Sequence, residues 1–457
     1  MVGTVSGTLA ASPTTTEGDE MSTQQVQAVR LPRLLSGISD DGQMSLGEHL
    51  AIHGELPAGR GRRRARGIAA GLVESVERAG LCGRGGAAFP TAVKMRAVAA
   101  AGRRGIVVGN GAEGEPASLK DRLLLETLPH LVLDGGSLAA AAVGAGELIV
   151  CVPQSASTAR RSLTEALRER ARERYDSVAT RVVLVPDRYL AGQESALVNH
   201  LNGGPGLPAL TPPMPFERGV QRRPTLINNV ETLAHIALIA RYGSEWFREL
   251  GTTGQPGSAL LTLSGAIADP GVYEIEHGTP LGDVLEAAGG PTSEIKALLL
   301  GGYAGTWLPG LLAYTLCLSA EQLAPYGAGL GPGIVLALSE DACGVAETAR
   351  VTRWLAAQTS GQCGPCVHGL NTIASAVEEL AAGTAAPQTE RHIARWASMV
   401  RERGACAHPD GAVRFVASAL DVFAEEFAEH AQRGPCAACA RPSELPLPAR
   451  SRSRLAA

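Results

Sequence analysis

Apolar and polar positions follow two different periods along this chain. From about residue 67 to 245, short apolar runs typical of buried strands are separated by longer stretches with helical spacing. The strands are expected at 106–108, 148–152 and 182–185, and the helices at 137–146, 157–174 and 192–201. Strands that alternate with helices predict an α/β layer with a parallel sheet and ligand-binding loops at the strand ends.

The pattern changes at about residue 255. Two strands, at 260–265 and 272–275, flank a Pro-Gly turn, and a short helix at 280–290 is followed by a strand at 297–300. This ββαβ order predicts a small second domain. The uncharged stretch 297–320 is long enough to span a bilayer, but its glycines and proline interrupt a helix. We therefore expect it to form a buried strand, turn and helix.

From about 345 to 430 the apolar residues recur every three or four positions, which predicts four helices in an up-down bundle. The last residues are rich in Pro, Arg and Ser. The expected organisation is a disordered segment at 1–30, an α/β domain at 31–250, a second domain at 255–335, a helical bundle at 345–432 and a tail at 433–457.

Composition narrows the class of protein. Among 457 residues, 45% are hydrophobic and 19% charged, which favours a folded protein, and the net charge of −4 argues against nucleic acid as a main partner. Residues 1–20 lack the basic and apolar segments of a signal peptide, and Met21 is an alternative start. The nine cysteines are sparse over the first 340 residues, which favours cytoplasmic thiols over a disulfide framework.

Three cysteines are expected to converge. Cys363 and Cys366 form a C-x-x-C pair just before the second bundle helix, and Cys406 lies between the third and fourth helices. In an up-down bundle these two loops share one end, together with Ser360. Cys436 and Cys439 follow the fourth helix, which at 1.5 Å per residue carries them about 28 Å away. We expect them to lie outside this site.

The residues alone leave the chemistry of this site open. Three cysteines and one polar residue suit an iron–sulfur cluster. With His368 or His408 they would instead form a Cys3His zinc site. A third interpretation is that the cysteines only pack as small apolar side chains.

A first glycine-rich loop, GLCGRGGAAFPTAVK (80–94), is suited to phosphate. Its exposed N–H groups, with Arg84 and Lys94 nearby, can bind an anion. The alternative is an ordinary glycine turn.

A second loop, at 107–116, fits G-x-G-x-x-G after a strand, and Asp134 lies 20 residues beyond its last glycine. A dinucleotide loop must open directly into a helix. Here Pro116 follows Glu115, and both Glu113 and Glu115 would repel a phosphate. We therefore reject the dinucleotide interpretation and expect the acidic side chains to bind ribose hydroxyls, a carboxamide or a flavin edge.

Five motifs occur in one order: GRGGAAFPTAVK, NGAEGEPASLKDR, YLAGQESALVNHLNG, NNVETLAHI and SGQCGPC. Together they resemble the NADH-binding flavoprotein subunit of respiratory complex I (the F-type subunit) and its relatives in soluble hydrogenases and formate dehydrogenases. The resemblance runs from about 67 to 430. It implies an α/β domain that binds FMN and NADH, a β-grasp domain of the soluble-ligand-binding type and a four-helix bundle with an iron–sulfur site.

The resemblance also implies roles for individual residues. It assigns FMN to Gly83, Arg84, Gly85, Gly86, Lys94, Asn110, Glu113, Gly192, Asn228, Asn229 and Thr232. It assigns NADH to Phe89, Lys94, Glu115 and Glu194. The implied cluster ligands are Cys363, Cys366 and Cys406, with Ser360 in the place of a fourth cysteine. No side chain has a catalytic role of its own, because the cofactors carry the chemistry.

The chain departs from the family pattern at several positions. Gln193 stands where the family has a glutamate, and Ala112 where it has an aspartate. Met214 and Arg96 stand where aromatic residues stack on adenine. Ser360 predicts a four-iron cluster with one oxygen ligand, a labile three-iron cluster or no cluster.

The implied function is that of an NADH dehydrogenase subunit. It would oxidise NADH through FMN and pass single electrons to an iron–sulfur cluster, then to a quinone- or ferredoxin-linked partner such as a 2Fe-2S subunit. The expected location is the cytoplasm, peripheral to a membrane complex but without membrane insertion. One alternative is an FMN and iron–sulfur protein with a donor other than NADH, motivated by Gln193, Met214 and Arg96. Another is a non-catalytic zinc scaffold.

Overall fold

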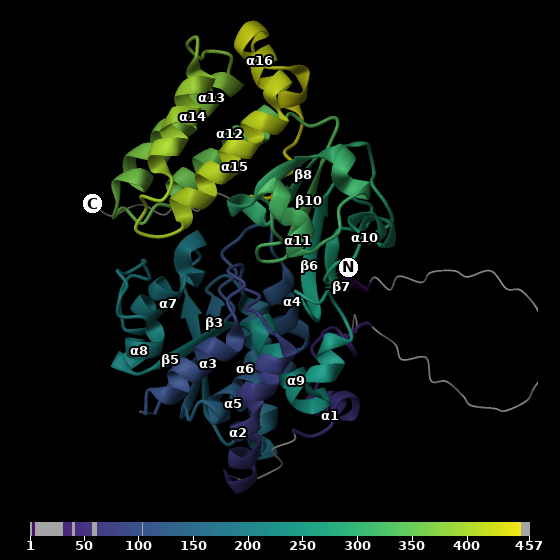
Figure 1. Ribbon diagram of the computed structural model, residues 1–457, viewed down its shortest axis with the longest axis vertical. Coiled ribbons are helices and arrows are strands. Elements are labelled where there is room, and N and C mark those ends of the chain that lie inside the picture. Colours follow the sequence, from purple (N-terminus) through teal and green to yellow (C-terminus); the bar gives the residue numbers. More distant parts are fainter. Residues whose placement is uncertain (1, 5–30, 39–41, 57–61, 103, 449–457) are drawn as a thin grey trace, which may run out of the picture.

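The computed structural model describes residues 2–4, 31–38, 42–56, 62–102 and 104–448. Figure 1 shows an α/β body, drawn in purple to teal, beneath a green sheet and a group of yellow-green helices. Within the expected disordered segment, Val2–Thr4 forms strand β1, so that prediction is wrong for these residues. Residues 5–30, including Met21, lie outside the described residues.

The α/β body is built on a parallel sheet with strand order β4-β3-β2-β5. Its strands are β2 (Ile106–Asn110), β3 (Glu147–Pro153), β4 (Ala179–Val185) and β5 (Thr225–Asn229). Its helices are α1 (Leu46–His53), α2 (Arg62–Ala79), α3 (Thr91–Ala100), α4 (Lys120–Thr127), α5 (Pro129–Ala142), α6 (Ser157–Arg172), α7 (Glu194–Leu201), α8 (Pro215–Arg218) and α9 (Val230–Arg248).

The three expected strands lie within β2, β3 and β4, whereas β5 was not predicted from the sequence. It runs directly into α9, so no turn signal separates strand from helix. In register, Asn110 at the end of β2 pairs with Asn229 at the end of β5. The chain proceeds from β2 to β3 on one side and reaches β5 on the other. This reversal of strand order is where open α/β sheets bind ligands.

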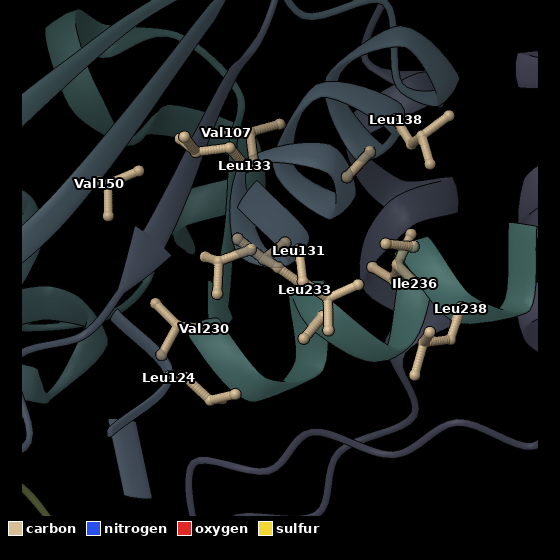
Figure 2. Packing of buried hydrophobic residues seen from close by; sticks show 14 of the residues in the cluster. Val107, Leu124, Leu131, Leu133, Leu138, Val150, Val230, Leu233, Ile236 and Leu238 are labelled. Atoms are coloured by element: carbon tan, nitrogen blue, oxygen red, sulfur yellow. The ribbon is translucent and has the colours of Figure 1, made fainter. Parts of the chain in front are cut away.

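Buried aliphatic side chains fix α5 and α9 against the sheet, as Figure 2 shows for Leu131, Leu133 and Leu233. The two helices approach so closely that a Cβ on Gly135 would lie 1.7 Å from the carbonyl oxygen of Leu233. Only glycine fits at this crossing, which holds the start of α9 and the end of β5 in a fixed position.

The second sheet has the order β1-β7-β6-β10-β8-β9. Its elements are β6 (Ser258–Gly265), β7 (Gly271–Glu276), α10 (Leu281–Ala287), β8 (Ile295–Leu300), β9 (Thr306–Pro309), α11 (Ala320–Leu323) and β10 (Ile334–Ser339). The stretch 297–320 begins with a buried strand and a turn as expected, but the chain then returns as β9, antiparallel to β8, and only a short 3-10 helix (Gly310–Tyr314) follows it. No helix in the described ranges is both long and apolar enough to cross a membrane.

The helical region consists of α12 (Gly344–Ala357), α13 (Asn371–Ala381), α14 (Thr389–Val400), α15 (His408–Val422) and α16 (Ala424–Arg433). Helices α12 and α14 each pack against both α13 and α15. The expected single fourth helix is broken at Phe423, where the backbone leaves helical geometry.

The expected tail is not a loose extension as far as residue 448. Leu445 is buried, and the backbone N–H of Ser339 donates to the Glu444 carboxylate (2.9 Å). The segment after α16 therefore folds back onto the start of α12 and the end of β10.

Asp134, which lies at the spacing of a ribose-binding acid, instead joins four helices. Its carboxylate accepts from Arg170 on α6 (2.8 Å) and from Arg241 on α9, and it lies 2.8 Å from the His49 ring on α1. Burial opposes ionisation, but Arg170, His49 and Arg241 hold the pKa of Asp134 far below its usual range. This aspartate is a structural anchor of the α/β body.

We predict that Asp134→Asn destabilises the protein by about 3–5 kcal/mol, because two buried guanidinium groups lose their shared counter-charge. The measurement is the urea midpoint of the far-UV circular dichroism signal. Asp283→Asn, at an exposed position on α10, is the control and should change stability by less than about 0.5 kcal/mol. Equal midpoints for the two variants would contradict the anchor role.

Candidate functional site

A cavity of about 770 Å³ opens at the carboxyl ends of β2 and β5. All three regions of the chain contribute to its wall. The α/β body supplies the two glycine-rich loops and the strand ends, the second sheet supplies residues 301–306 and 327–332, and the helical region supplies Cys406, His408 and Arg414. Its volume is that of a cofactor site.

The first glycine-rich loop lines this cavity through Gly83, Gly85 and Gly86. A Cβ on Gly85 would meet its nearest neighbour only at 3.5 Å, so protein packing does not demand glycine there. Gly86 has φ +107°, a conformation that L side chains rarely adopt. The loop thus leaves backbone surface open toward the cavity.

Arg84 does not present its charge to the cavity, in contrast to the expectation. Its guanidinium bonds to the His277 ring (2.6 Å) and to the carbonyl of Ser258 (2.9 Å), both in the second sheet. Its backbone N–H donates to Thr232 Oγ1 (2.9 Å). Arg84 and Thr232 therefore hold the glycine loop in place from behind, and Thr232 itself is fully buried.

Three asparagines lie side by side at the strand ends. Asn110 donates to the carbonyl of Gly192 (2.7 Å), which joins the second loop to the cavity wall. Asn229 begins α9 by accepting from the backbone N–H of Glu231 (3.0 Å). The enclosed side-chain nitrogen of Asn228 has no hydrogen-bond partner in the described part of the chain. It is a donor suited to a ligand.

Glu113 lines the cavity but its oxygens are already used. They accept from Ser118 Oγ (2.7 Å) and from the backbone N–H groups of Asp121 and Arg122 (each 2.9 Å) at the start of α4. Glu113 therefore caps a helix. Because α4 begins only at Lys120, the glycines of this loop do not open into a helix, in agreement with rejection of the dinucleotide motif.

Glu115 has a carboxylate with spare capacity. One oxygen accepts from the backbone N–H of Tyr303 (3.0 Å) and the hydroxyl of Tyr189 (3.3 Å), whereas the enclosed Oε1 has no partner among the described residues. Burial raises the pKa of Glu115 to about 7 despite these hydrogen bonds. An enclosed carboxylate oxygen whose pKa lies near neutral is suited to accept a hydrogen bond from a hydroxyl or amide group of a ligand.

Lys94 and Glu194 form an ion pair at the cavity wall, and Lys94 Nζ lies 5.7 Å from the ring centre of Phe89. Phe89 is 46% exposed at the cavity wall, so it presents apolar surface to a ligand. Gln193 begins α7 by accepting from the backbone N–H of Ala196 (2.9 Å). Gln193 therefore acts as a helix cap.

The two positions expected to replace stacking aromatics lie outside the cavity wall. Arg96 pairs with Glu77 on the surface, with both side chains about half exposed. Met214 is exposed at the start of α8. Arg96 therefore does not stand in for an adenine-stacking ring.

A buried charge network at the cavity wall was missed from the sequence. Lys120 Nζ lies 2.6 Å from Asp121 and 2.8 Å from Glu231, and it donates to Asn229 Oδ1 (3.1 Å). Burial opposes the charge on Lys120, but the two carboxylates raise its pKa. The charged residues are visible in the sequence, since Lys120 and Asp121 lie in SLKDR and Glu231 in NNVETLAHI. Adjacent charged residues are more often solvated at the surface, so the sequence did not indicate a buried network.

The cysteine loops meet at one end of the helical region, as the up-down order requires. Cys366 is buried in a π-helical turn, Pro365–Leu370, and burial raises its pKa to about 12, with Cys363 and Cys406 as further causes. Burial also raises the pKa of Cys363, but hydrogen bonds from the backbone N–H groups of Ala405 and Cys366 lower it overall. Ser360 lies half-buried in the same loop.

These cysteines do not form a site for a single ion. The structure's described residues hold one group of three or more metal-binding side chains within 4.8 Å of one another, and it does not include Cys363, Cys366, Cys406, His368 or His408. His408 Nε2 instead bonds to the carbonyl of Leu355 (3.0 Å). The described side chains therefore give no support to a Cys3His zinc site at these positions.

The residues present fit FMN and an adjoining cluster. The cavity offers open glycine backbone, together with an Asn228 side-chain nitrogen and a Glu115 oxygen that have no partner among the residues described. Cys406 lies in its wall. A cofactor in the cavity would therefore lie next to the thiols.

Comparisons with known proteins agree with this arrangement. Residues 76–238 match the Nuo51 FMN-binding domain, 260–299 an SLBB domain and 346–430 the iron–sulfur binding region of NADH-ubiquinone oxidoreductase F. An NADH-quinone oxidoreductase F-type subunit of Rhizobium meliloti is 32% identical over 379 residues, covering 80% of this chain and 90% of that protein. The corresponding F-type subunit of Escherichia coli K12 is 32% identical over 377 residues, covering 78% and 83%.

A solved NAD+-reducing NiFe hydrogenase in the air-oxidised state has a TM-score of 0.75 and 32% identity. The match covers 80% of this chain and 65% of that hydrogenase chain. By sequence and by structure, the chain belongs to the family of NADH-quinone oxidoreductase F-type subunits.

Proposed function

We propose that this chain oxidises NADH at FMN bound in the cavity and passes electrons to an iron–sulfur cluster on Cys363, Cys366 and Cys406. The observation that carries this proposal is that Cys406 lines the same cavity as Gly85 and Asn228. FMN, when bound, accepts a hydride from NADH and releases the two electrons singly. The protein's task is to hold donor, flavin and thiols in one enclosed place.

The residues divide this task between them. The Gly83–Gly86 backbone holds the phosphate end of FMN, and Asn228 donates to the flavin. Glu115 accepts from a hydroxyl or carboxamide of the dinucleotide through its unpaired oxygen. Phe89 stacks on a ring of NADH at the cavity mouth, with Lys94 and Glu194 beside it. The Lys120, Asp121 and Glu231 ion pairs would hold the cavity wall and the strand end at Asn229 in place.

Ser360 takes the place of the fourth ligand, and its oxygen is a harder ligand than a thiolate. The cluster is of the 4Fe-4S type with one oxygen ligand, or of the 3Fe-4S type without it. Electrons leave to a ferredoxin-like 2Fe-2S subunit, and the chain works as one subunit of a dehydrogenase or hydrogenase assembly, cytoplasmic and peripheral to a membrane complex.

We further interpret the second sheet as a β-grasp domain and helices α12 to α15 as a four-helix bundle. In support, β6, β7, α10 and β8 follow the expected order, and β10 joins the same sheet between β6 and β8. The four helices pack in a closed ring of pairs.

We predict that NADH binding depends on Phe89. Phe89→Ala should weaken NADH binding about five- to tenfold, because one stacking contact is worth about 1 kcal/mol, and should leave FMN content unchanged. The measurement is stopped-flow bleaching of the flavin against NADH concentration. Tyr242→Ala, at an exposed aromatic outside the cavity, is the control. If excess NADH leaves the wild-type flavin oxidised, the donor is another molecule.

We predict that the side chain at position 360 determines the iron content of the cluster. Ser360→Cys should raise the iron and acid-labile sulfide content toward four per chain and slow cluster loss in air, since a fourth thiolate holds the fourth iron. Iron analysis and EPR of anaerobic protein measure this. Ser398→Cys, on the exposed face of α14, is the control. Unchanged iron and EPR would place residue 360 outside the cluster, and zinc without iron would support the scaffold alternative.

We predict that the stability of the protein depends on pH through Glu115. The pKa of Glu115 in the folded state, about 7, lies above the ordinary glutamate value of 4.5. The folded state therefore binds more protons between these values, and stability falls as pH rises from 4.5 to 7. Glu115→Gln should remove a cost of up to about 3 kcal/mol at pH 8 and almost none at pH 4.5. Denaturant unfolding without NADH at both pH values measures this, and a gain independent of pH would contradict it.

A further inference from the structure

A second group of metal-binding side chains lies outside the site described above. Cys343, His430, Cys436 and Cys439 place one ligand atom each within 4.8 Å of all the others. Cys343 precedes α12, His430 lies near the end of α16, and the two remaining cysteines follow in the returning segment. We propose that these four residues bind a zinc ion as a Cys3His site.

The distances are those of a tetrahedron around one ion. With Zn–S of about 2.3 Å and Zn–N of about 2.0–2.1 Å, neighbouring sulfurs should lie about 3.8 Å apart and sulfur and nitrogen about 3.6 Å apart. Cys439 Sγ lies 3.7 Å from Cys436 Sγ and 3.5 Å from Cys343 Sγ. His430 Nε2 lies 3.5 Å from Cys343 Sγ and 3.7 Å from Cys439 Sγ.

Hydrogen bonds with neighbouring backbone groups orient two of these ligands. His430 Nδ1 lies 3.2 Å from the carbonyl oxygen of Ala381, which can accept only from a protonated nitrogen. The lone pair is therefore on Nε2, the atom that faces the sulfurs. Such a carbonyl partner is typical of metal-binding histidines. Cys343 Sγ accepts from the backbone N–H of Ala346 at the start of α12 (3.3 Å), which orients the sulfur toward the group.

Two other interpretations explain less. A disulfide has a sulfur–sulfur distance of about 2.05 Å and joins two cysteines, leaving a third cysteine and an oriented histidine without a role. A four-iron cluster binds each cysteine to a different iron, which separates the sulfurs, whereas these four ligand atoms surround one point. The site is also distinct from Cys363 and Cys366, because they follow α12 and Cys343 precedes it. The 14 residues of α12 are about 21 Å long.

The zinc would fix the C-terminal segment to the molecule. Beyond Cys439, Glu444 accepts from Ser339, and the carbonyl of Pro446 accepts from the Tyr303 hydroxyl. The backbone N–H of Tyr303 in turn donates to Glu115 in the cavity wall. The ion therefore supports, through this segment, one wall of the cavity.

The test is metal analysis of the full chain, purified anaerobically with FMN and iron. We expect one zinc ion per chain in addition to iron, with X-ray absorption at the zinc edge showing three sulfurs and one nitrogen. Cys439→Ser should lose the zinc and gain protease cleavage near residues 434–448. Cys317→Ser, at a cysteine outside both groups, should keep zinc and iron. Cys363→Ser should lose iron and keep zinc, which separates this site from the proposed function.

The wild-type measurement decides the matter even if Cys439→Ser does not fold. Cobalt in place of zinc should give the strong visible bands of a tetrahedral thiolate site. The proposal is overturned if iron-loaded wild-type protein contains only trace zinc. It is also overturned if the zinc has only oxygen and nitrogen neighbours, or if mass spectrometry of native protein finds a disulfide among Cys343, Cys436 and Cys439.

Discussion

The packing of the helical region onto the carboxyl edge of the parallel sheet is the contact on which the rest depends. Tyr189 lies at this joint. Its backbone N–H donates to Gln358 at the end of α12 (3.2 Å), its ring lies 5.4 Å from the His408 ring, and its hydroxyl donates to Glu115. Because the loop that holds Cys406 continues into His408, this contact also places the thiol in the cavity wall. Without it there would be a nucleotide cavity and a cysteine loop, but no path between them.

Direct ion pairs between buried side chains hold the cavity wall together. Lys120 and Asp121 in this wall and the buried Glu231 satisfy one another, so they fix the loop and strand ends through direct ion pairs. Glu115 differs, since its carboxylate keeps an enclosed oxygen without a partner in the described part of the chain. The enclosed oxygen is therefore available to a hydroxyl or amide donor of a ligand.

Helix α12 links the two cysteine groups. Its last turn leads into the loop of Cys363, and its first turn is preceded by Cys343. The proposed ion at one end and the cluster at the other would hold both ends of the same helix. The element that carries the electron acceptor would then be rigid along its whole length, which keeps its distance from the cavity constant.

Local pattern was sufficient for much of this protein. Strands β2, β3 and β4, the helices of the C-terminal region and the glycine loops follow from periodicity and from Gly and Pro positions, because these are properties of neighbouring residues. The order of the helices also predicted that Cys363, Cys366 and Cys406 share one end. The motifs, and the place of Cys406 beside Cys363 and Cys366, could therefore be predicted from the sequence alone.

Long-range contacts decided the remainder. Nothing near Arg84 in the chain indicates that its guanidinium bonds to His277 and Ser258, and nothing near Asp134 indicates Arg170 and Arg241. The break at Phe423 and the return of the last segment bring Cys436 and Cys439 to Cys343, about ninety residues away in sequence. Sequence determined which chemical groups were present and their local conformation. Tertiary structure decided which groups meet, because burial and ion pairing act between residues that are distant along the chain.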